Sequence, residues 1–207
     1  FCNNSENRTK LNVDINLKID NNPILIKANS GIGKTTICKM IASHYPTYKN
    51  NLINNILFIP KNTILNYNNR SLLNIITNDD IYDNEINYDL ISNIKNIIPI
   101  NDIITSCKKN NINYIIEEDN TFSAGQSRRI FLFMYLYHLF TNIYKYKIVI
   151  IDELEKNLDK NNFDIIINNI LNNSILKNIK LIIISHYNIN NIKTYNVNNI
   201  NNTLTLI

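Results

Sequence analysis

Residues 28–36 read "ANSGIGKTT", and Gly33-Lys34-Thr35 within this stretch matches the end of the phosphate-binding pattern GxxxxGK[ST]. The pattern begins with glycine, whereas this sequence has Ala28. Alanine disfavours a positive φ and would cost about 1 kcal/mol if the loop requires one. The stretch is therefore predicted to be a phosphate-binding loop. Ala28 is expected to weaken phosphate binding rather than abolish it.

The residue types in this loop suit an anion for simple geometric reasons. Gly31 and Gly33 let backbone N–H groups turn inward, and a helix that follows would present its positive end. Lys34 supplies a point charge, and the hydroxyl of Thr35 can bind Mg²⁺. The sequence thus predicts a site for a phosphate together with a divalent cation.

Length and composition favour a folded domain. A chain of 207 residues can bury a full core and suggests one domain, with a subdomain at most. Asparagine and isoleucine each make up about a fifth of the chain, which contains 3 glycines, 4 prolines and no tryptophan. A Gln/Asn-rich, prion-like segment is the alternative interpretation. Periodic isoleucines between the asparagines favour a packed core instead.

Charge, cysteines and hydropathy narrow the class of protein further. A net charge of +4 with scattered lysines favours a solvated surface over a nucleic-acid or anionic membrane site. The three cysteines show no CxxC spacing, so neither a disulfide framework nor a zinc site is indicated. The longest apolar run, 130–140, is shorter than the ~18–20 residues of a membrane span, and is predicted to be a buried helix.

No signal peptide is recognised at the start of the sequence. Because the sequence begins with Phe1 rather than Met, we expect it to be part of a longer protein. Membrane spans upstream of Phe1 are compatible with that expectation.

The order of the predicted elements is that of an α/β domain. Apolar residues alternate over 11–19, and strands are predicted at 24–27, 55–60, 147–152 and 180–185. Continuous isoleucine and valine runs in the last two favour parallel strands covered on both faces. Helical spacing is found at 35–45, over much of 71–140 and near 160–172, and the last residues suggest a closing antiparallel pair.

The stretch "IVIIDE" at 148–153 supplies what a phosphate-binding loop needs next. A hydrophobic strand would deliver Asp152 beside Mg²⁺, and Glu153 would polarise an attacking water. The alternative is a buried strand that merely ends in carboxylates. The position of this strand, downstream of a GKT loop, favours the catalytic interpretation.

The stretch "FSAGQSRR" at 122–129 opens the long apolar helix. The hydroxyl of Ser123 can donate a hydrogen bond, and Gly125 permits the close approach of an anion. The start of this helix is therefore a candidate anion site. An ordinary helix N-cap is the alternative interpretation.

These motifs, in this order, resemble the ATP-binding cassette (ABC) ATPase domain over nearly the whole chain. "ANSGIGKTT" is similar to the Walker A loop, "FSAGQ" to the LSGGQ signature and "IVIIDE" to the Walker B strand. "NLD" (157–159) is similar to the D-loop, and His186 in "IIISH" to the switch histidine. Residues 44–77 are weakly similar to the peroxisomal and SbmA-type exporter subfamily.

The resemblance implies roles for particular residues. The phosphate-binding residues would be Asn29, Ser30, Gly31, Ile32, Gly33, Lys34, Thr35 and Thr36. Thr35 and Asp152 would hold Mg²⁺, Glu153 would be the general base, and His186 would contact the γ-phosphate. The residues that face the ATP of a partner domain would be Ser123, Ala124, Gly125 and Gln126, and Asp159 would help to join the two domains.

The sequence departs from the family pattern in several places. Lys61 aligns with the glutamine of the Q-loop, so a neutral side chain that meets Mg²⁺ and water is replaced by a cation, and repulsion between Lys61 and Mg²⁺ puts its usual role in doubt. Ala124 replaces the first glycine of the signature, and Leu154 stands where proline is common. No aromatic residue for stacking on adenine is evident.

The sequence therefore predicts a single ABC-type nucleotide-binding domain over 1–207, with a P-loop NTPase core at about 1–70 and 146–207 and a helical subdomain at about 71–145. The core sheet would be mainly parallel, with an N-terminal antiparallel strand region. By the resemblance, the domain would hydrolyse ATP with Mg²⁺, pair head to tail with a second cassette and power a membrane-spanning partner at the cytoplasmic face of a membrane. No specific nucleic acid is expected. A soluble ABC-type ATPase that acts on DNA or ribosomes, and a degenerate half-site with little hydrolysis, are the alternatives.

Overall fold

The computed structural model describes residues 12–14, 22–27, 32–42, 55–65, 70–77, 86–107, 112, 122–200 and 203–206. Over these residues, seven strands form one sheet in the order β1-β7-β6-β2-β5-β4-β3. The strands are β1 (Asn12–Asp14), β2 (Ile24–Lys27), β3 (Ile56–Ile59), β4 (Ile148–Ile151), β5 (Lys180–Ile184), β6 (Lys193–Ile200) and β7 (Thr203–Leu206). The strands predicted at 24–27, 55–60, 147–152 and 180–185 are thus confirmed.

The centre of the sheet is parallel. Strands β6, β2, β5, β4 and β3 all run in the same direction. β7 pairs antiparallel with the second half of β6, which confirms the predicted closing pair. β1 pairs in parallel with β7, so β1 runs opposite to the central strands although its own pairing is not antiparallel. The N-terminal strand β1 is therefore antiparallel to the central strands, as predicted, but it reaches them only through β7, which lies between β1 and β6.

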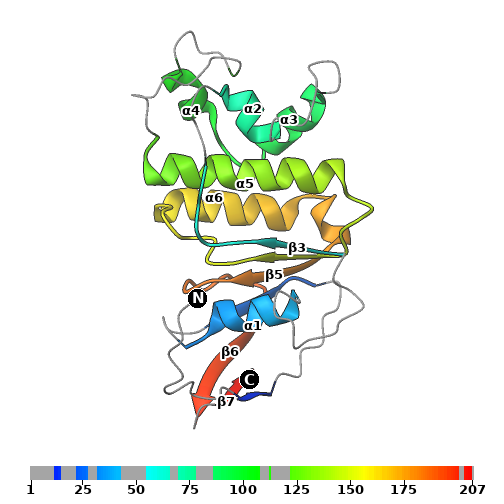
Figure 1. Ribbon diagram of the computed structural model, residues 1–207, viewed down its shortest axis with the longest axis vertical. Helices are drawn as coiled ribbons and strands as arrows, with labels where there is room; N and C mark the ends of the chain where they lie inside the picture. The colour runs from blue at the N-terminus through cyan, green and yellow to red at the C-terminus, as the bar shows by residue number, and fades with distance from the viewer. Residues whose placement is uncertain are drawn as a thin grey trace, which may run out of the picture.

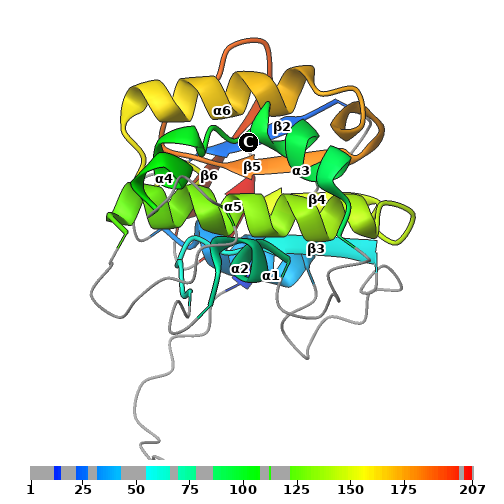
Figure 2. The same cartoon turned by 90° about the horizontal axis from the view of Figure 1, so that it is seen from above.

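Helices cover both faces of the sheet (Figure 1). They are α1 (Lys34–Ile41), α2 (Leu72–Thr77), α3 (Tyr88–Lys95), α4 (Asn101–Ser106), α5 (Ala124–Thr141) and α6 (Lys160–Asn172), with a short 3₁₀ turn, η4 (Leu176–Asn178). α1 lies on one face of the sheet, and α5 and α6 lie on the other. The helices α2, α3 and α4 lie beyond α5, on its far side from the sheet (Figure 1), and Figure 2 looks down on the molecule from that side.

Strands β3 and β4 are apolar at every position, and β2 and β5 at all but one, because both faces of this part of the sheet are covered. On β4, Ile148 and Ile150 belong to the cluster that contains Ile37 of α1, while Val149 and Ile151 belong to the larger cluster around α5 and α6. Burying one such side chain stabilises the fold by roughly 1.5–3 kcal/mol. The absence of polar alternation on these strands is therefore explained by the helices on either side.

Helix α5 is the buried helix that the apolar run at 130–140 predicts. Its buried residues include Ile130, Phe133 and Leu139, and it packs against α2 and α3 as well as the sheet. Contacts on several sides explain why this helix is apolar nearly all round. None of the helices in the described ranges combines the length and the apolar character that a membrane span requires.

Candidate functional site

The carboxyl ends of the central strands bring the predicted catalytic residues to one edge of the sheet. β2 leads towards the start of α1, β3 is followed by Lys61, β4 by Asp152 and Glu153, and β5 by His186. Parallel strands end at the same edge, and ligands of open α/β sheets bind outside it. Residues separated by more than a hundred positions in sequence therefore meet here.

The start of α1 has the geometry of a phosphate-binding turn. Gly33 has a φ of 109°, which a side chain at this position would oppose, and its carbonyl accepts the first helical hydrogen bond, from Ile37 N at 3.0 Å. The next residue, Lys34, is 4% exposed. Desolvation lowers the pKa of Lys34, and the nearby carboxylates of Glu153, Glu155 and Asp152 oppose that shift. A buried ammonium at a helix N-terminus is suited to an anionic ligand.

Part of the predicted loop lies outside the described residues. Ala28, Asn29, Ser30 and Gly31 belong to that part, so the structure does not test the prediction about the first position. Ile32 and Thr36 are half-buried, and Ile32 packs against the cluster under α1.

Thr35 and Asp152 meet directly. Thr35 Oγ1 donates a hydrogen bond of 2.8 Å to Asp152 Oδ2. Asp152 is 0% exposed, and its backbone N–H bonds to Ile59 O of β3 at 2.9 Å. Desolvation raises the pKa of Asp152, while the Thr35 bond lowers it. The contact joins the phosphate-binding turn to the strand that carries the acidic pair.

The oxygens at this contact fit a magnesium ion. Asp152 Oδ1 is buried and has no hydrogen-bond partner among the described residues. A buried carboxylate oxygen without a partner is costly unless a donor or a cation satisfies it. Mg²⁺ prefers oxygen ligands and is commonly held by one or two protein groups with phosphates and waters. The described chain contains no cluster of three or more His, Cys, Asp or Glu side chains that would hold a metal unaided.

Glu153 has a strained backbone, and the side chains of a lysine and a histidine lie next to it. Its φ of 45° lies in the left-handed region, which a residue with a Cβ avoids unless the surroundings hold it there. Glu153 Oε1 lies 3.3 Å from Lys61 Nζ and 3.8 Å from His186 Nε2. The side chain of Glu153 is 18% exposed. The residue predicted as general base therefore lies at the ends of the central strands and contacts Lys61, for which the resemblance predicts the Q-loop position.

Glu155 was not among the predicted site residues, yet it holds the histidine. Its Oε1 accepts a hydrogen bond of 2.6 Å from the backbone N–H of His186. Just before it, Ser185 N donates to Ile26 O of β2 at 3.3 Å. The only sequence signal for this role was a third carboxylate in "DELE", two positions beyond the predicted base.

Arg128 is the second residue for which the sequence analysis predicted no role. It lies on α5, is 0% exposed, and donates to Pro60 O at 2.8 Å and to both Asp152 O and Glu153 O at 3.1 Å. Desolvation lowers the pKa of Arg128 to about 10, although the nearby acidic side chains act to raise it. Its rigid fork of donors fixes the ends of β3 and β4 relative to α5. The only sequence signal was a charged pair at the start of an apolar helix.

The signature-like stretch forms a helix cap. Ser123 is the N-cap of α5. The backbone N–H of Gln126 donates to Ser123 Oγ at 3.2 Å, and the backbone N–H of Ser123 donates to Gln126 Oε1 at 3.0 Å. A Cβ added to Gly125 would lie 3.0 Å from Asn157 O, so glycine permits a close approach to the turn after β4. The N-cap interpretation describes this geometry, and the contact of Ser123, Ala124 and Gln126 with a partner stays a prediction.

Asp159 is also a cap in this structure. It is the N-cap of α6, and its side chain accepts from Asn162 N at 2.8 Å. Hydrogen bonds from Asn162 lower the pKa of Asp159. Within the described parts of the chain, no hydrogen bond or ion pair joins Ser123, Gln126 or Asp159 to the side chains around Glu153. Their predicted role between domains is untested.

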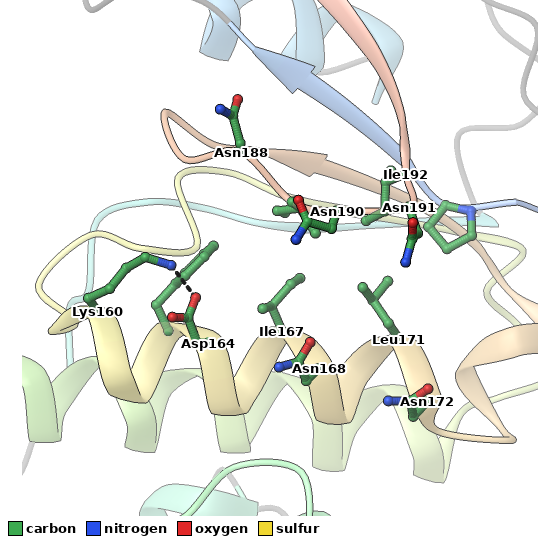
Figure 3. A pocket seen from close by; sticks show the side chains of 13 residues that line it. Lys160, Asp164, Ile167, Asn168, Leu171, Asn172, Asn188, Asn190, Asn191 and Ile192 are labelled. Atoms are coloured by element: carbon green, nitrogen blue, oxygen red, sulfur yellow. Dashed lines mark hydrogen bonds and ion pairs between the residues drawn. The ribbon is translucent and has the colours of Figure 1, made fainter.

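A groove elsewhere on the molecule contains none of the predicted site residues. It measures about 670 Å³ and lies between α6 and the turn that follows β5 (Figure 3). Figure 3 shows asparagines at its rim, over Ile167 and Leu171, and the ion pair between Lys160 and Asp164 at one end. The candidate site is therefore identified by its chemistry rather than by the size of a cavity.

Comparisons with known proteins place the fold. No protein-family model matches the sequence, and no curated protein matches it. In structure, the chain is similar to a bacterial Atm1-family ABC exporter with ATP bound, with a TM-score of 0.61 and 17% sequence identity over 80% of this chain. The match covers 30% of the exporter, so this chain spans less than a third of its length. The similarity shows an α/β fold with a mainly parallel sheet, which is consistent with a P-loop NTPase-like domain and confirms the predicted fold class.

Proposed function

We propose that this chain is the ATP-binding and ATP-hydrolysing domain of an ABC transporter. The observation that carries the proposal is the bond between Thr35 and Asp152, with an unpartnered carboxylate oxygen on Asp152 and Glu153 beside it. Two sequence motifs that lie more than a hundred residues apart, the GKT loop and the strand that ends in Asp152 and Glu153, meet at this point. A structural likeness to an ABC exporter with ATP bound supports the same proposal.

Binding of the nucleotide would depend on the start of α1. The buried ammonium of Lys34 and the N–H groups of the first helical turn would attract the terminal phosphates. Mg²⁺, held by Thr35 and Asp152, would neutralise phosphate charge when it is bound. Asn29, Ser30, Gly31, Gly33 and Thr36 complete the proposed phosphate-binding set.

Hydrolysis would depend on Glu153. Its carboxylate would accept a proton from the water that attacks the γ-phosphorus, and the bond between that phosphorus and the bridging oxygen of ADP would break. His186, held by Glu155 through its backbone, would donate to the γ-phosphate. Arg128 would keep Glu153 in place through its bond to the Glu153 carbonyl. We infer an ATP hydrolase in which the general base, Glu153, and the donor to the γ-phosphate, His186, both belong to this chain.

The proposed partner is a second ABC ATPase domain, paired head to tail when ATP binds. Ser123, Ala124, Gly125 and Gln126 would face the partner's ATP, and Asp159 would lie at the junction. A membrane-spanning transporter domain would be powered by this pair at the cytoplasmic face of a membrane, with a helical subdomain at about 71–145 as its docking part. The exporter that resembles this chain supports an exporter-like arrangement.

The contact between Lys61 and Glu153 favours a second candidate, a domain that binds ATP and hydrolyses it slowly. Both candidate functions place ATP at Lys34 and differ only in the rate of hydrolysis. A measurement of ATP affinity therefore tests the binding site that the two candidates share.

Substitution of Lys34 tests the proposed site. Lys34→Met removes the buried ammonium, and we expect affinity for MgATP to fall by about tenfold or more, because one charge-assisted contact contributes about 1.5–3 kcal/mol. Lys39→Met, in the last turn of the same helix, is the matched control and is expected to bind MgATP as the wild type does. The measurement is a calorimetric titration of the 207-residue chain. Equal affinity for the wild type and Lys34→Met would contradict the proposal.

A further inference from the structure

Lys61 directly contacts the residue proposed as general base. The distance between Lys61 Nζ and Glu153 Oε1 is 3.3 Å, and their positions lie 92 residues apart in sequence. Both side chains are partly withdrawn from water, at 35% exposure for Lys61 and 18% for Glu153. The ammonium therefore occupies one of the two oxygens on which proton transfer from water would depend.

The backbone holds this contact in place. Arg128 donates to Pro60 O at the end of β3 and to Glu153 O after β4, with a longer contact of 3.5 Å to Lys61 O. One guanidinium thus fixes the two segments that carry the ammonium and the carboxylate. Because the chain positions are already fixed, forming the ion pair costs mainly the ordering of two side chains.

His186 approaches the same oxygen from another strand. Its Nε2 lies 3.8 Å from Glu153 Oε1, so this oxygen faces two nitrogen groups. A water that approaches Glu153 must compete with these groups for the carboxylate. The ammonium of Lys61 is the stronger competitor, because it lies closer to the carboxylate oxygen than His186 Nε2 does.

We propose that Lys61 is a positioning residue that restrains Glu153, so that the domain binds ATP well but hydrolyses it more slowly than it would with a neutral side chain at this position. The inference rests on the proposed function, since it assigns Glu153 the role of base. Lys61 acts through Glu153 and need not touch ATP. Release of the carboxylate requires Lys61 to move, which adds the free energy of the ion pair to the barrier for hydrolysis.

The size of the effect follows from the exposure of the pair. Partly exposed ion pairs contribute up to about 1 kcal/mol, which corresponds to roughly fivefold in rate. We therefore expect Lys61→Gln to raise kcat about fivefold, with KM for ATP unchanged within about twofold. Lys61→Arg keeps the charge and should retain the wild-type rate.

The experiment measures steady-state turnover and calorimetric ATP affinity for the wild type, Lys61→Gln, Lys61→Met and Lys61→Arg. Lys156→Gln is the matched control, because the ammonium of this nearby lysine bonds to Asn62 Oδ1 at 3.0 Å, while the bond of Lys156 to Glu153 is made by its backbone N–H, which the substitution keeps. It should leave kcat unchanged. In a Glu153→Gln background, Lys61→Gln should make no difference, since the restraint acts through the carboxylate.

The outcomes separate the inference from the proposed function. A higher kcat in both neutral variants, absent in the Glu153→Gln background and in Lys61→Arg, supports the restraint. An unchanged or lower kcat in Lys61→Gln and Lys61→Met, with ATP affinity intact, overturns the restraint alone. Failure of the wild type to bind MgATP overturns the proposed function and the restraint with it.

Discussion

At the scale of single residues, the buried carboxylate of Asp152 lowers the stability of the fold, although the proposed magnesium site depends on it. It is buried, it carries an oxygen without a partner among the described residues, and desolvation raises its pKa. A raised pKa means that the folded state holds the proton more tightly than the unfolded chain does. The ionised form therefore lowers stability at neutral pH, and this loss shrinks as the pH falls below the raised pKa and is gone below the ordinary pKa of an aspartate.

Asp152→Asn is expected to separate the two effects. The amide removes a buried charge but keeps the size of the side chain, so the free energy of unfolding without ligand should rise by about 1 kcal/mol. The stabilisation that MgATP gives the wild type should be lost in the variant, because the cation loses its carboxylate. Urea unfolding with and without MgATP measures both.

Asp164→Asn is the control for Asp152→Asn. Asp164 pairs with Lys160 on the surface of α6, and its substitution should change neither quantity by more than about 0.5 kcal/mol. A loss of stability in ligand-free Asp152→Asn would show that the burial of this charge does not strain the fold.

The sequence predicted site residues where a local pattern carries the chemistry. Lys34, Thr35, Asp152 and Glu153 lie at a turn or strand end that the pattern itself predicts. Arg128 was missed because its partners are backbone carbonyls, which any residue type supplies and which only the fold brings within reach of the guanidinium. The ion pair of Lys61 was not foreseen, because Lys61 and Glu153 lie 92 residues apart in sequence and only the fold brings them together.

At the scale of elements, α5 joins the two strand ends that carry the site. Arg128 bonds to the residues after β3 and β4, and Gly125 allows the start of the helix to approach Asn157. A shift of α5 would therefore move Glu153 and Lys61 together. We infer that this helix transmits changes at its N-terminus to the proposed base.

Arg128→Met tests this link. The substitution leaves buried carbonyls at both strand ends without their donor, and hydrogen bonds to charged groups contribute about 1.5–3 kcal/mol each. We expect the free energy of unfolding to fall by about 3 kcal/mol and turnover to fall as well, because Glu153 loses its support.

The control for Arg128→Met is Arg129→Met, on the same helix. Arg129 pairs with Asp102, which is half exposed, and solvent screens that pair, so a smaller loss of stability is expected. Unfolding in urea and ATP turnover compare the two variants. Equal losses of stability in both would contradict a special role for Arg128.

Among the elements, those with a strong apolar pattern were predicted best. The continuous Ile and Val runs of β4 and β5 indicated strands covered on both faces, and the clusters on the two sides of the sheet confirm it. The pairing of β1 with β7 was not predicted, because the partners lie nearly two hundred residues apart and no local pattern encodes register between them.

At the scale of the whole molecule, the fold and the order of motifs agree. A mainly parallel sheet with helices on both faces has the carboxyl ends of its strands at one edge, which is where the fold places Asp152, Glu153 and His186. The order of five motifs in the sequence predicted this fold even though the composition is unusual. The division into a core and a helical subdomain, and the pairing with a second domain, remain predictions from the resemblance.

The central claim is that this chain hydrolyses ATP with Glu153 as its base. The most direct measurement compares turnover of MgATP by the wild type and Glu153→Gln, with ATP binding measured in parallel. We expect both to bind MgATP and the variant to turn over about a hundredfold more slowly, or slower still, because general base catalysis contributes about 10²–10⁴ in rate. Turnover by the wild type that is no faster than that of Glu153→Gln, with ATP bound by both, would contradict the claim.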